Sequence, residues 1–170
     1  LKENAPAWLV SNSFRKDMQE KKNLVDNTII TERTDNVNML LDSHLVRFNI
    51  TDRKQAESNL LDIFVPAVLE IESKGDYQAK NLEGSSASGG FQFLGKSEKY
   101  PKGSAIAALN RLEKYLGPRE WGAELREHGD ASLISPMQQT ELFIGDMLEK
   151  SGSDKFMQLV FDGDMEGMIQ

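Results

Sequence analysis

The stretch from Leu69 to Phe93 reads L-E-I-E-S-K-G-D-Y-Q-A-K-N-L-E-G-S-S-A-S-G-G-F-Q-F and is the part of the chain on which the predicted fold depends. An apolar helical pattern runs into Glu72 and Ser73, and a turn at residues 74–76 opens a polar loop. The loop closes on residues 88–93, whose alternating pattern predicts a short strand. The stretch therefore predicts a helix that carries a carboxylate at its end and faces a glycine-rich turn and a strand.

The side chain of Glu72 is the candidate catalytic group. At the end of a largely apolar helix its carboxyl is partly removed from water, which disfavours the charged form and raises the pKa. A carboxylic acid that stays protonated near neutral pH can donate a proton to a glycosidic oxygen. Along the predicted strand Gln92 faces away from Phe91 and Phe93, so burial of the two Phe rings would point Gln92 into a cleft.

These residues resemble the lysozyme-like transglycosylase superfamily. Its members carry a helix that ends in Glu-Ser, a short polar loop, and a Gly-Gly-apolar-Gln-apolar strand, which Glu72-Ser73 and the segment 89–93 match. The spacing is close to that of resuscitation-promoting factors and soluble lytic transglycosylases, and the similarity covers Pro66 to about Thr140. The helix that begins at residues 135–139, followed by the segment 163–169, is similar to the C-terminal part of phage-type muramidases and virion-associated lysozyme domains.

The resemblance implies a mainly α (α+β) fold, in which a lysozyme-like domain has a small β-hairpin beside the catalytic helix. We assign residues 51–170 to this domain and residues 1–50 to an N-terminal helical extension or linker, and we interpret the chain as a fragment of a longer protein. In the extension, a helical stripe of apolar residues runs from Val37 to Phe48. In the catalytic helix, Pro66 predicts a kink or break near residues 62–65, since an interior proline removes a hydrogen bond.

The resemblance also implies the reaction, which is cleavage of the MurNAc-GlcNAc β-1,4 bond of peptidoglycan. Glu72 would protonate the leaving oxygen and then accept the proton of the muramic 6-hydroxyl, which gives a 1,6-anhydro product, as in a lytic transglycosylase. Gln92, Ser88 and Asn81 are the expected substrate-binding residues, and no metal or cofactor is expected. The alternative chemistry is hydrolysis by a muramidase, which needs a second carboxylate; Asp76 and Glu83 are the nearby candidates.

Composition limits the possible partners. The net charge is −7, yet residues 74–126 hold nine basic against six acidic side chains, which would suit an anionic polymer such as peptidoglycan. The acidic balance argues against nucleic acid, no apolar run is long enough for a membrane span, and the absence of Cys with only two His disfavours a zinc site.

We expect a phage virion or tail protein that acts on the bacterial cell wall or periplasm, with the N-terminal helices contacting other virion subunits. A secreted bacterial enzyme is the alternative location. A glycan-binding or structural lysozyme-like module without catalysis is the alternative function. It is motivated by residues 107–110, which lack the Ala-Tyr-Asn motif that soluble lytic transglycosylases carry after the strand.

Overall fold

The computed structural model describes residues 12–25, 35–80, 86–95, 104–150 and 152–169. In these residues the protein is mainly helical with one small two-stranded antiparallel sheet, which confirms the coarse fold class predicted from the sequence. The chain forms two compact units, residues 1–71 with 151–170 and residues 72–150. The division into an extension (1–50) and a domain (51–170) stays a prediction.

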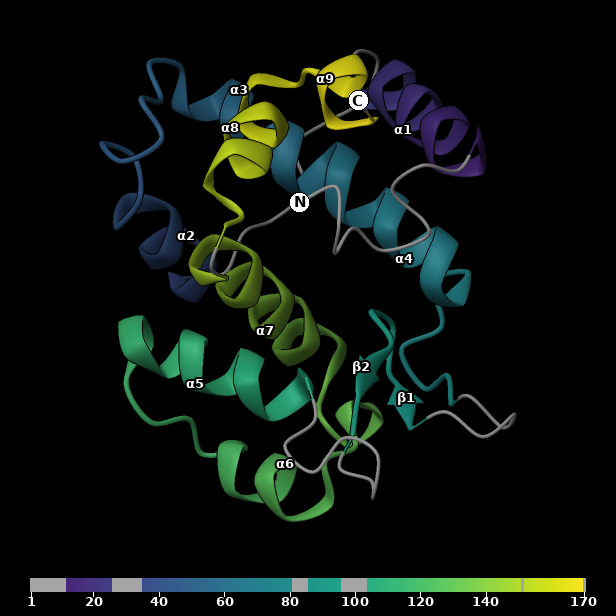
Figure 1. The fold of residues 1–170 in the computed structure, drawn as a ribbon, viewed down its shortest axis with the longest axis vertical. Coiled ribbons are helices and arrows are strands. Elements are labelled where there is room, and N and C mark those ends of the chain that lie inside the picture. The colour runs from purple at the N-terminus through teal and green to yellow at the C-terminus, as the bar shows by residue number, and fades with distance from the viewer. Residues whose placement is uncertain (1–11, 26–34, 81–85, 96–103, 151, 170) are drawn as a thin grey trace. The chain divides into compact units, whose positions relative to one another are not determined.

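The described residues of the first unit form helices joined by turns and irregular segments, with no strand among them. It contains α1 (Asn12–Val25), α2 (Asp35–Asp42), α3 (Arg53–Ser58), the π-helix η2 (Asn59–Phe64), α4 (Val65–Ser73) up to residue 71, α8 (Asp154–Asp162) and α9 (Met165–Ile169) (Figure 1). Phenylalanine rings meet within its largely aliphatic core: the Phe64 ring meets Phe14 edge-on at 6.2 Å and Phe156 at 5.7 Å between ring centroids. Edge-to-face pairs of this kind are favourable beyond the area that they bury.

The predicted helical stripe is buried, although α2 ends at Asp42. Residues 43–49 continue as hydrogen-bonded turns, and these still bury His44 and Phe48. The ring nitrogen Nδ1 of His44 lies 2.7 Å from the carbonyl oxygen of Leu40, so this histidine is a satisfied core residue.

The segment before Pro66 widens into a π-helix rather than breaking. The N–H of Val65 donates to the carbonyl of Leu60, five residues earlier, and α4 then continues through Pro66 to Ser73. A proline ring would meet the carbonyl four residues before it in a regular α-helix, and it has no N–H to donate. A π turn shifts the hydrogen-bonding pattern, so a different carbonyl faces the proline ring. The sequence therefore predicts the correct place of the helix irregularity but not that it is a π turn.

The second unit contains the hairpin and three helices among its described residues. Its elements are β1 (Ala87–Ser88), β2 (Phe93–Leu94), α5 (Ser104–Leu116), α6 (Gly122–His128), the 3₁₀ turn η3 (Ala131–Leu133) and α7 (Pro136–Glu149). In Figure 1, α5 lies alongside α7. A Cβ on Gly145 would lie 2.8 Å from Leu112 Cδ1, so the missing side chain lets the two helices approach closely.

Local sequence signals set the end of α5 and the start of α7. Ser135 caps α7 in a complete capping box with Gln138, and Pro136 occupies the first turn. Gly117 ends α5 in the left-handed conformation, at φ 75°, and its N–H donates to the carbonyl of Glu113. Polar pairs between Arg111 and Asp146 and between Tyr115 and Glu149 join α5 to α7.

Candidate active site

Glu72 is a partly buried carboxyl in the last turn of α4, where the second unit begins. Burial raises its pKa above the ordinary value of 4.5. It makes no hydrogen bond or ion pair with any residue that the structure describes, and the last turn of α4 contains no basic residue. Because the carbonyl end of a helix carries partial negative charge, the helix also disfavours an ionised carboxyl here. Position and surroundings therefore both favour the protonated acid.

A tight reversal of the chain follows Glu72. The N–H of Asp76 donates to the carbonyl of Ser73 at 3.1 Å, and both residues between them have left-handed backbones, Lys74 at φ 55° and Gly75 at φ 80°. Glycine adopts this conformation at little cost, whereas a residue with a side chain, such as lysine, adopts it at a cost in conformational energy. The reversal leads the chain directly from the acid to the segment that lies along the hairpin.

The hairpin differs from the predicted strand of residues 88–93. Only Ala87–Ser88 and Phe93–Leu94 pair as strands, in the register Ala87 with Leu94 and Ser88 with Phe93. Residues 89–92 form the connecting turn, closed by a 3.2 Å hydrogen bond from the N–H of Gln92 to the carbonyl of Gly89. The alternation of apolar and polar residues does not mark a continuous strand here, because a turn that buries its aromatic residue gives the same pattern as a strand.

Gln92 sits at the end of this turn and not within a strand. Its backbone is left-handed, at φ 52°, and its side-chain Nε2 donates to the carbonyl of Gly89 at 2.8 Å. The side chain is partly exposed, and its amide oxygen has no hydrogen-bond partner among the described residues. Gln92 can therefore still accept a hydrogen bond from a ligand while it closes the turn.

Ser88 is buried in the hairpin at 4% exposure, and its Oγ accepts a 2.8 Å hydrogen bond from the N–H of Ala131. This places the hydroxyl in the structural framework of the turn, and its contact with substrate stays a prediction. Asn81, the third predicted binding residue, lies outside the described residues.

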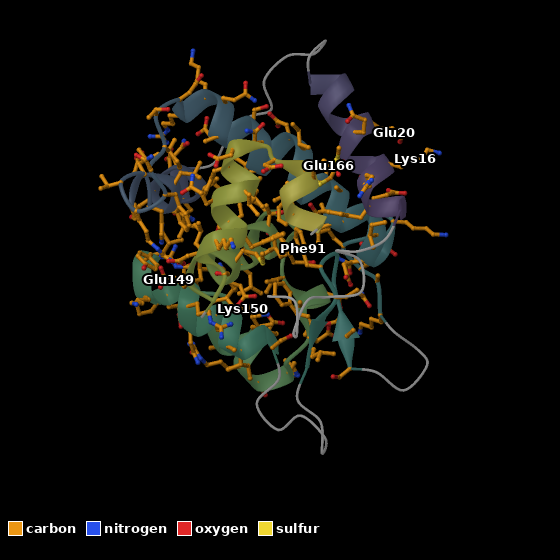
Figure 2. The ribbon with its side chains drawn as sticks, turned by 45° about the horizontal axis from the view of Figure 1, so that its top comes forward. Lys16, Glu20, Phe91, Glu149, Lys150 and Glu166 are labelled. Carbon is orange, nitrogen blue, oxygen red and sulfur yellow. The ribbon has the colours of Figure 1, made fainter. Side chains whose placement is uncertain are left out.

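The aromatic residue of the turn anchors the hairpin on α7. The ring of Phe91, labelled in Figure 2, stacks on Phe143 with 4.3 Å between centroids and 9° between planes. Tyr77 meets the same ring edge-on at 6.2 Å, and Phe93 lies 6.3 Å away. Phe91 and Phe93 are both buried, as the sequence predicts. This cluster ties the segment after Glu72 to the hairpin and to α7.

Gln139 of α7 is a site residue that the sequence did not reveal. It is completely buried, and its amide oxygen accepts a 2.8 Å hydrogen bond from the N–H of Gly90. Its amide nitrogen donates at 3.0 Å to the carbonyl of Tyr77 and at 3.0 Å to that of Ile134. Gln139 lies on the inward face of the helix beside Leu142 and Phe143, and a buried polar side chain needs hydrogen-bond partners. This position is the sequence signal from which Gln139 could have been identified.

The candidates for a second carboxylate are differently placed. Asp76 is exposed and accepts a 2.9 Å hydrogen bond from the N–H of Gln78, as a turn residue does; Glu83 lies outside the described residues. Asp130 is close to the hairpin but is engaged with Lys80 at 3.0 Å and with the hydroxyl of Ser132 at 2.6 Å. Desolvation works to raise the pKa of Asp130, but these hydrogen bonds outweigh it and hold the pKa below its ordinary value.

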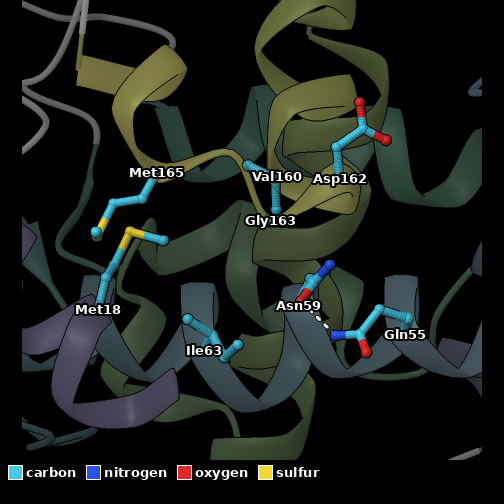
Figure 3. Close-up of a pocket in the computed structure, with 8 residues that line it drawn as sticks. All are labelled: Met18, Gln55, Asn59, Ile63, Val160, Asp162, Gly163 and Met165. Carbon is cyan, nitrogen blue, oxygen red and sulfur yellow. Dashed lines mark hydrogen bonds between the residues drawn. The ribbon is translucent and has the colours of Figure 1, made fainter. Parts of the chain in front are cut away.

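A separate pocket lies within the first unit and has different chemistry. It has a volume of about 290 Å³, and its lining mixes apolar side chains such as Met18 and Ile63 with polar ones such as Asp162 (Figure 3). At its edge Asn59 accepts a 2.9 Å hydrogen bond from Gln55 and donates to the carbonyl of Phe161 at 2.8 Å. The pocket contains none of the predicted site residues. We give it less weight than Glu72 as a catalytic candidate, because its lining pairs no acid with a base.

Among the described residues, no group of three His, Asp or Glu side chains lies close enough together to hold a metal ion, and no helix is both long and apolar enough to cross a membrane. Comparison of the chain with protein-family models, with curated proteins and with solved structures gives no match.

Proposed function

We propose that the chain is a peptidoglycan-degrading glycosidase that cleaves the MurNAc-GlcNAc β-1,4 bond as a lytic transglycosylase. The observation that carries the proposal is the state of Glu72. It is a partly buried carboxyl with a raised pKa and no partner among the described residues, at the negative end of a helix. A structural carboxylate is normally paired or fully solvated, whereas a general acid needs the protonated form near its working pH.

In the proposed reaction Glu72 acts twice. The protonated carboxyl donates its proton to the glycosidic oxygen as the bond to the anomeric carbon breaks. The N-acetyl group of the substrate stabilises the positive charge that develops on that carbon. The carboxylate then takes the proton of the muramic 6-hydroxyl while the hydroxyl oxygen bonds to the anomeric carbon, which regenerates the acid and gives a 1,6-anhydro product.

The surroundings of Asp76 and Asp130 support transglycosylation over hydrolysis. A hydrolytic muramidase needs a second carboxylate that is free to activate water. Asp76 is engaged in a turn, and Asp130 is held by Lys80. A mechanism that needs only one carboxylate is therefore more consistent with the surroundings of Asp76 and Asp130 than hydrolysis is.

Mass spectrometry of purified peptidoglycan digested with wild type, Glu72→Gln and Glu70→Gln tests the proposal. Glu70 is an exposed acid on the same helix and provides the matched control. We expect 1,6-anhydro products from wild type and from Glu70→Gln, and a loss of about 10² to 10⁴-fold in rate for Glu72→Gln. Full activity of Glu72→Gln would refute the role of Glu72, and reducing-end products would establish a muramidase instead.

The alternative is a lysozyme-like module that binds glycan without cleaving it. Ser88 is a predicted substrate-binding residue, yet its hydroxyl is buried and already accepts a hydrogen bond from the backbone N–H of Ala131. This arrangement favours the alternative. Glycan binding by the wild type without any product, beside a control enzyme that works, would support the module.

We further propose that the protein belongs to a phage virion or tail and contacts other virion subunits through its N-terminal helices. Two large apolar side chains are exposed there, Met39 on α2 at 50% and Val46 in the following turns at 95%. Apolar side chains exposed singly are common on protein surfaces, so this location rests on the resemblance of the C-terminal segment to virion-associated lysozyme domains. Detection of the chain in purified virions by mass spectrometry would support this location, and a secretion signal encoded upstream would favour the secreted alternative.

A further inference from the structure

We propose that Gln139 is a positioning residue that holds the hairpin turn of residues 89–92 in the conformation that receives the glycan. This inference rests on the proposed function, because it assigns the turn and Gln92 to the substrate site. It adds a residue from α7 that makes no contact with the reacting atoms and acts through the turn.

One side-chain amide joins three segments of the second unit. The oxygen of Gln139 accepts from the N–H of Gly90 in the turn at 2.8 Å. Its nitrogen donates to Tyr77, in the segment after Glu72, and to Ile134, just before α7, both at 3.0 Å. Both amide hydrogens are therefore used and the oxygen is engaged, in a position with 0% exposure. No other arrangement of the same amide would satisfy all three groups.

The turn is shaped around this amide. A Cβ on Gly89 would lie 2.5 Å from the amide oxygen of Gln139 and 3.2 Å from the Cβ of Ala131, so the backbone of the turn lies directly against it. The N–H of Gly89 is itself bound to the carbonyl of Ala79 at 2.8 Å. Without the glutamine, the N–H of Gly90 would be buried and unpaired, a state that folded proteins avoid.

Gln139 would affect glycan binding through the orientation of the Gln92 side chain. The side chain of Gln92 is held by the carbonyl of Gly89, and Gln139 holds the same peptide unit from its other side, through the N–H of Gly90. If that peptide rotates, the carbonyl that orients Gln92 rotates with it. Buried polar networks that are fully satisfied select one backbone conformation, which an apolar side chain of equal size cannot do.

The experiment compares Gln139→Met with Gln138→Met. Methionine has a similar length and fills the space without hydrogen bonds. Gln138 is the adjacent residue and serves only the capping box of α7 through the N–H of Ser135, so its loss weakens the helix end without touching the turn. Chitohexaose, a β-1,4-linked GlcNAc oligomer, is the probe. Its affinity and the hydrogen exchange of the Gly90 amide are both followed by NMR.

We expect Gln139→Met to keep its helical circular dichroism spectrum, to exchange the Gly90 amide at least about tenfold faster, and to bind chitohexaose about tenfold more weakly. Gln138→Met should match wild type in both measurements. Unchanged affinity in Gln139→Met, or an equal loss in Gln138→Met, would overturn the proposal. Wild type that binds the oligomer but cleaves no peptidoglycan would refute the proposed enzyme and leave the positioning role standing, whereas wild type that does not bind would overturn the positioning role as well.

Gln139→Glu provides a second test should the methionine variant fail to fold. As a carboxylate, the new side chain cannot donate to the carbonyls of Tyr77 and Ile134; when protonated it can donate to one of them. In either state at least one of these two carbonyls loses its donor, so we expect the variant to bind chitohexaose several-fold more weakly than wild type at the same pH. An affinity equal to that of wild type would overturn the proposal.

Discussion

Replacing Glu72 by glutamine should stabilise the protein at neutral pH, and this can be tested without any substrate. Glutamine has the same shape as glutamic acid but cannot ionise. The folded-state pKa of Glu72 is raised by desolvation. A group of this kind favours folding below its unfolded pKa, and that contribution is lost as the pH rises through the folded pKa. At neutral pH the wild type therefore carries a cost that Glu72→Gln does not.

The size of the effect follows from where Glu72 lies. A carboxylate at a helix C-terminus costs about 0.3–1 kcal/mol. Desolvation adds to this cost, but the group is only partly buried, so solvent screening keeps the addition to a fraction of about 1 kcal/mol. We expect Glu72→Gln to gain about 1 kcal/mol near pH 7, which corresponds to about 2–4 °C in melting temperature for a chain of this size.

The assay is thermal unfolding of wild type, Glu72→Gln and Glu70→Gln across a range of pH. The gain of Glu72→Gln should be near zero below the ordinary pKa of 4.5 and should grow as the pH rises above it. Glu70→Gln, in the same helix but exposed, should gain less. If Glu72→Gln is no more stable than wild type at neutral pH, or if its gain is equally large in acid, then the carboxyl is not the desolvated, unpaired group described above.

Two further substitutions test the packing of each unit. Gly145→Ala should destabilise by about 1 kcal/mol, because the clash with Leu112 costs about 1–3 kcal/mol and outweighs the better helix propensity of alanine. In a Leu112→Ala background this loss should shrink, since the 2.8 Å contact with Cδ1 is removed while the Cβ of residue 112 stays at 3.0 Å. An undiminished loss in denaturant unfolding would refute the cause. Asn59→Leu should cost about 1–3 kcal/mol, because it leaves the carbonyl of Phe161 buried without its donor. Gln55→Met keeps that bond and should cost less than about 0.5 kcal/mol in the same assay.

The elements that sequence patterns predicted well are those set by neighbouring residues. Ser135 and Gln138 bond each other across three residues, so the start of α7 is encoded locally. The place of Glu72 at the end of an apolar helix is local in the same sense. Pro66 likewise indicates where a regular helix is disturbed, although the choice between a break and a π turn depends on how the widened segment packs within its unit.

The features that sequence patterns missed depend on contacts between distant residues or on unusual backbone. Gln92 adopts a positive φ, which few residues other than glycine adopt, so nothing in its residue type predicted a turn. Gln139 bonds Gly90, 49 residues earlier in the chain, and Tyr77, 62 residues earlier. A periodicity argument shows that Gln139 faces inward but not what it meets there. The arrangement of residues in the hairpin turn could therefore not be derived from the motif alone.

The carboxyl of Glu72 makes no hydrogen bond or ion pair with a described residue, and this is the strongest physical reason to assign it a functional role. Other partly buried acids of the second unit have polar partners: Asp130 has Lys80 and Ser132, Glu113 has Arg126, and Asp146 has Arg111, although desolvation still raises the pKa of Asp146. Glu72 alone among these acids combines burial, a helix end of like charge and no described partner. Functional sites are where proteins retain groups that cost stability. The expected gain in stability on removing its charge and the expected loss of glycan cleavage thus have one cause, the incomplete solvation of a single carboxyl.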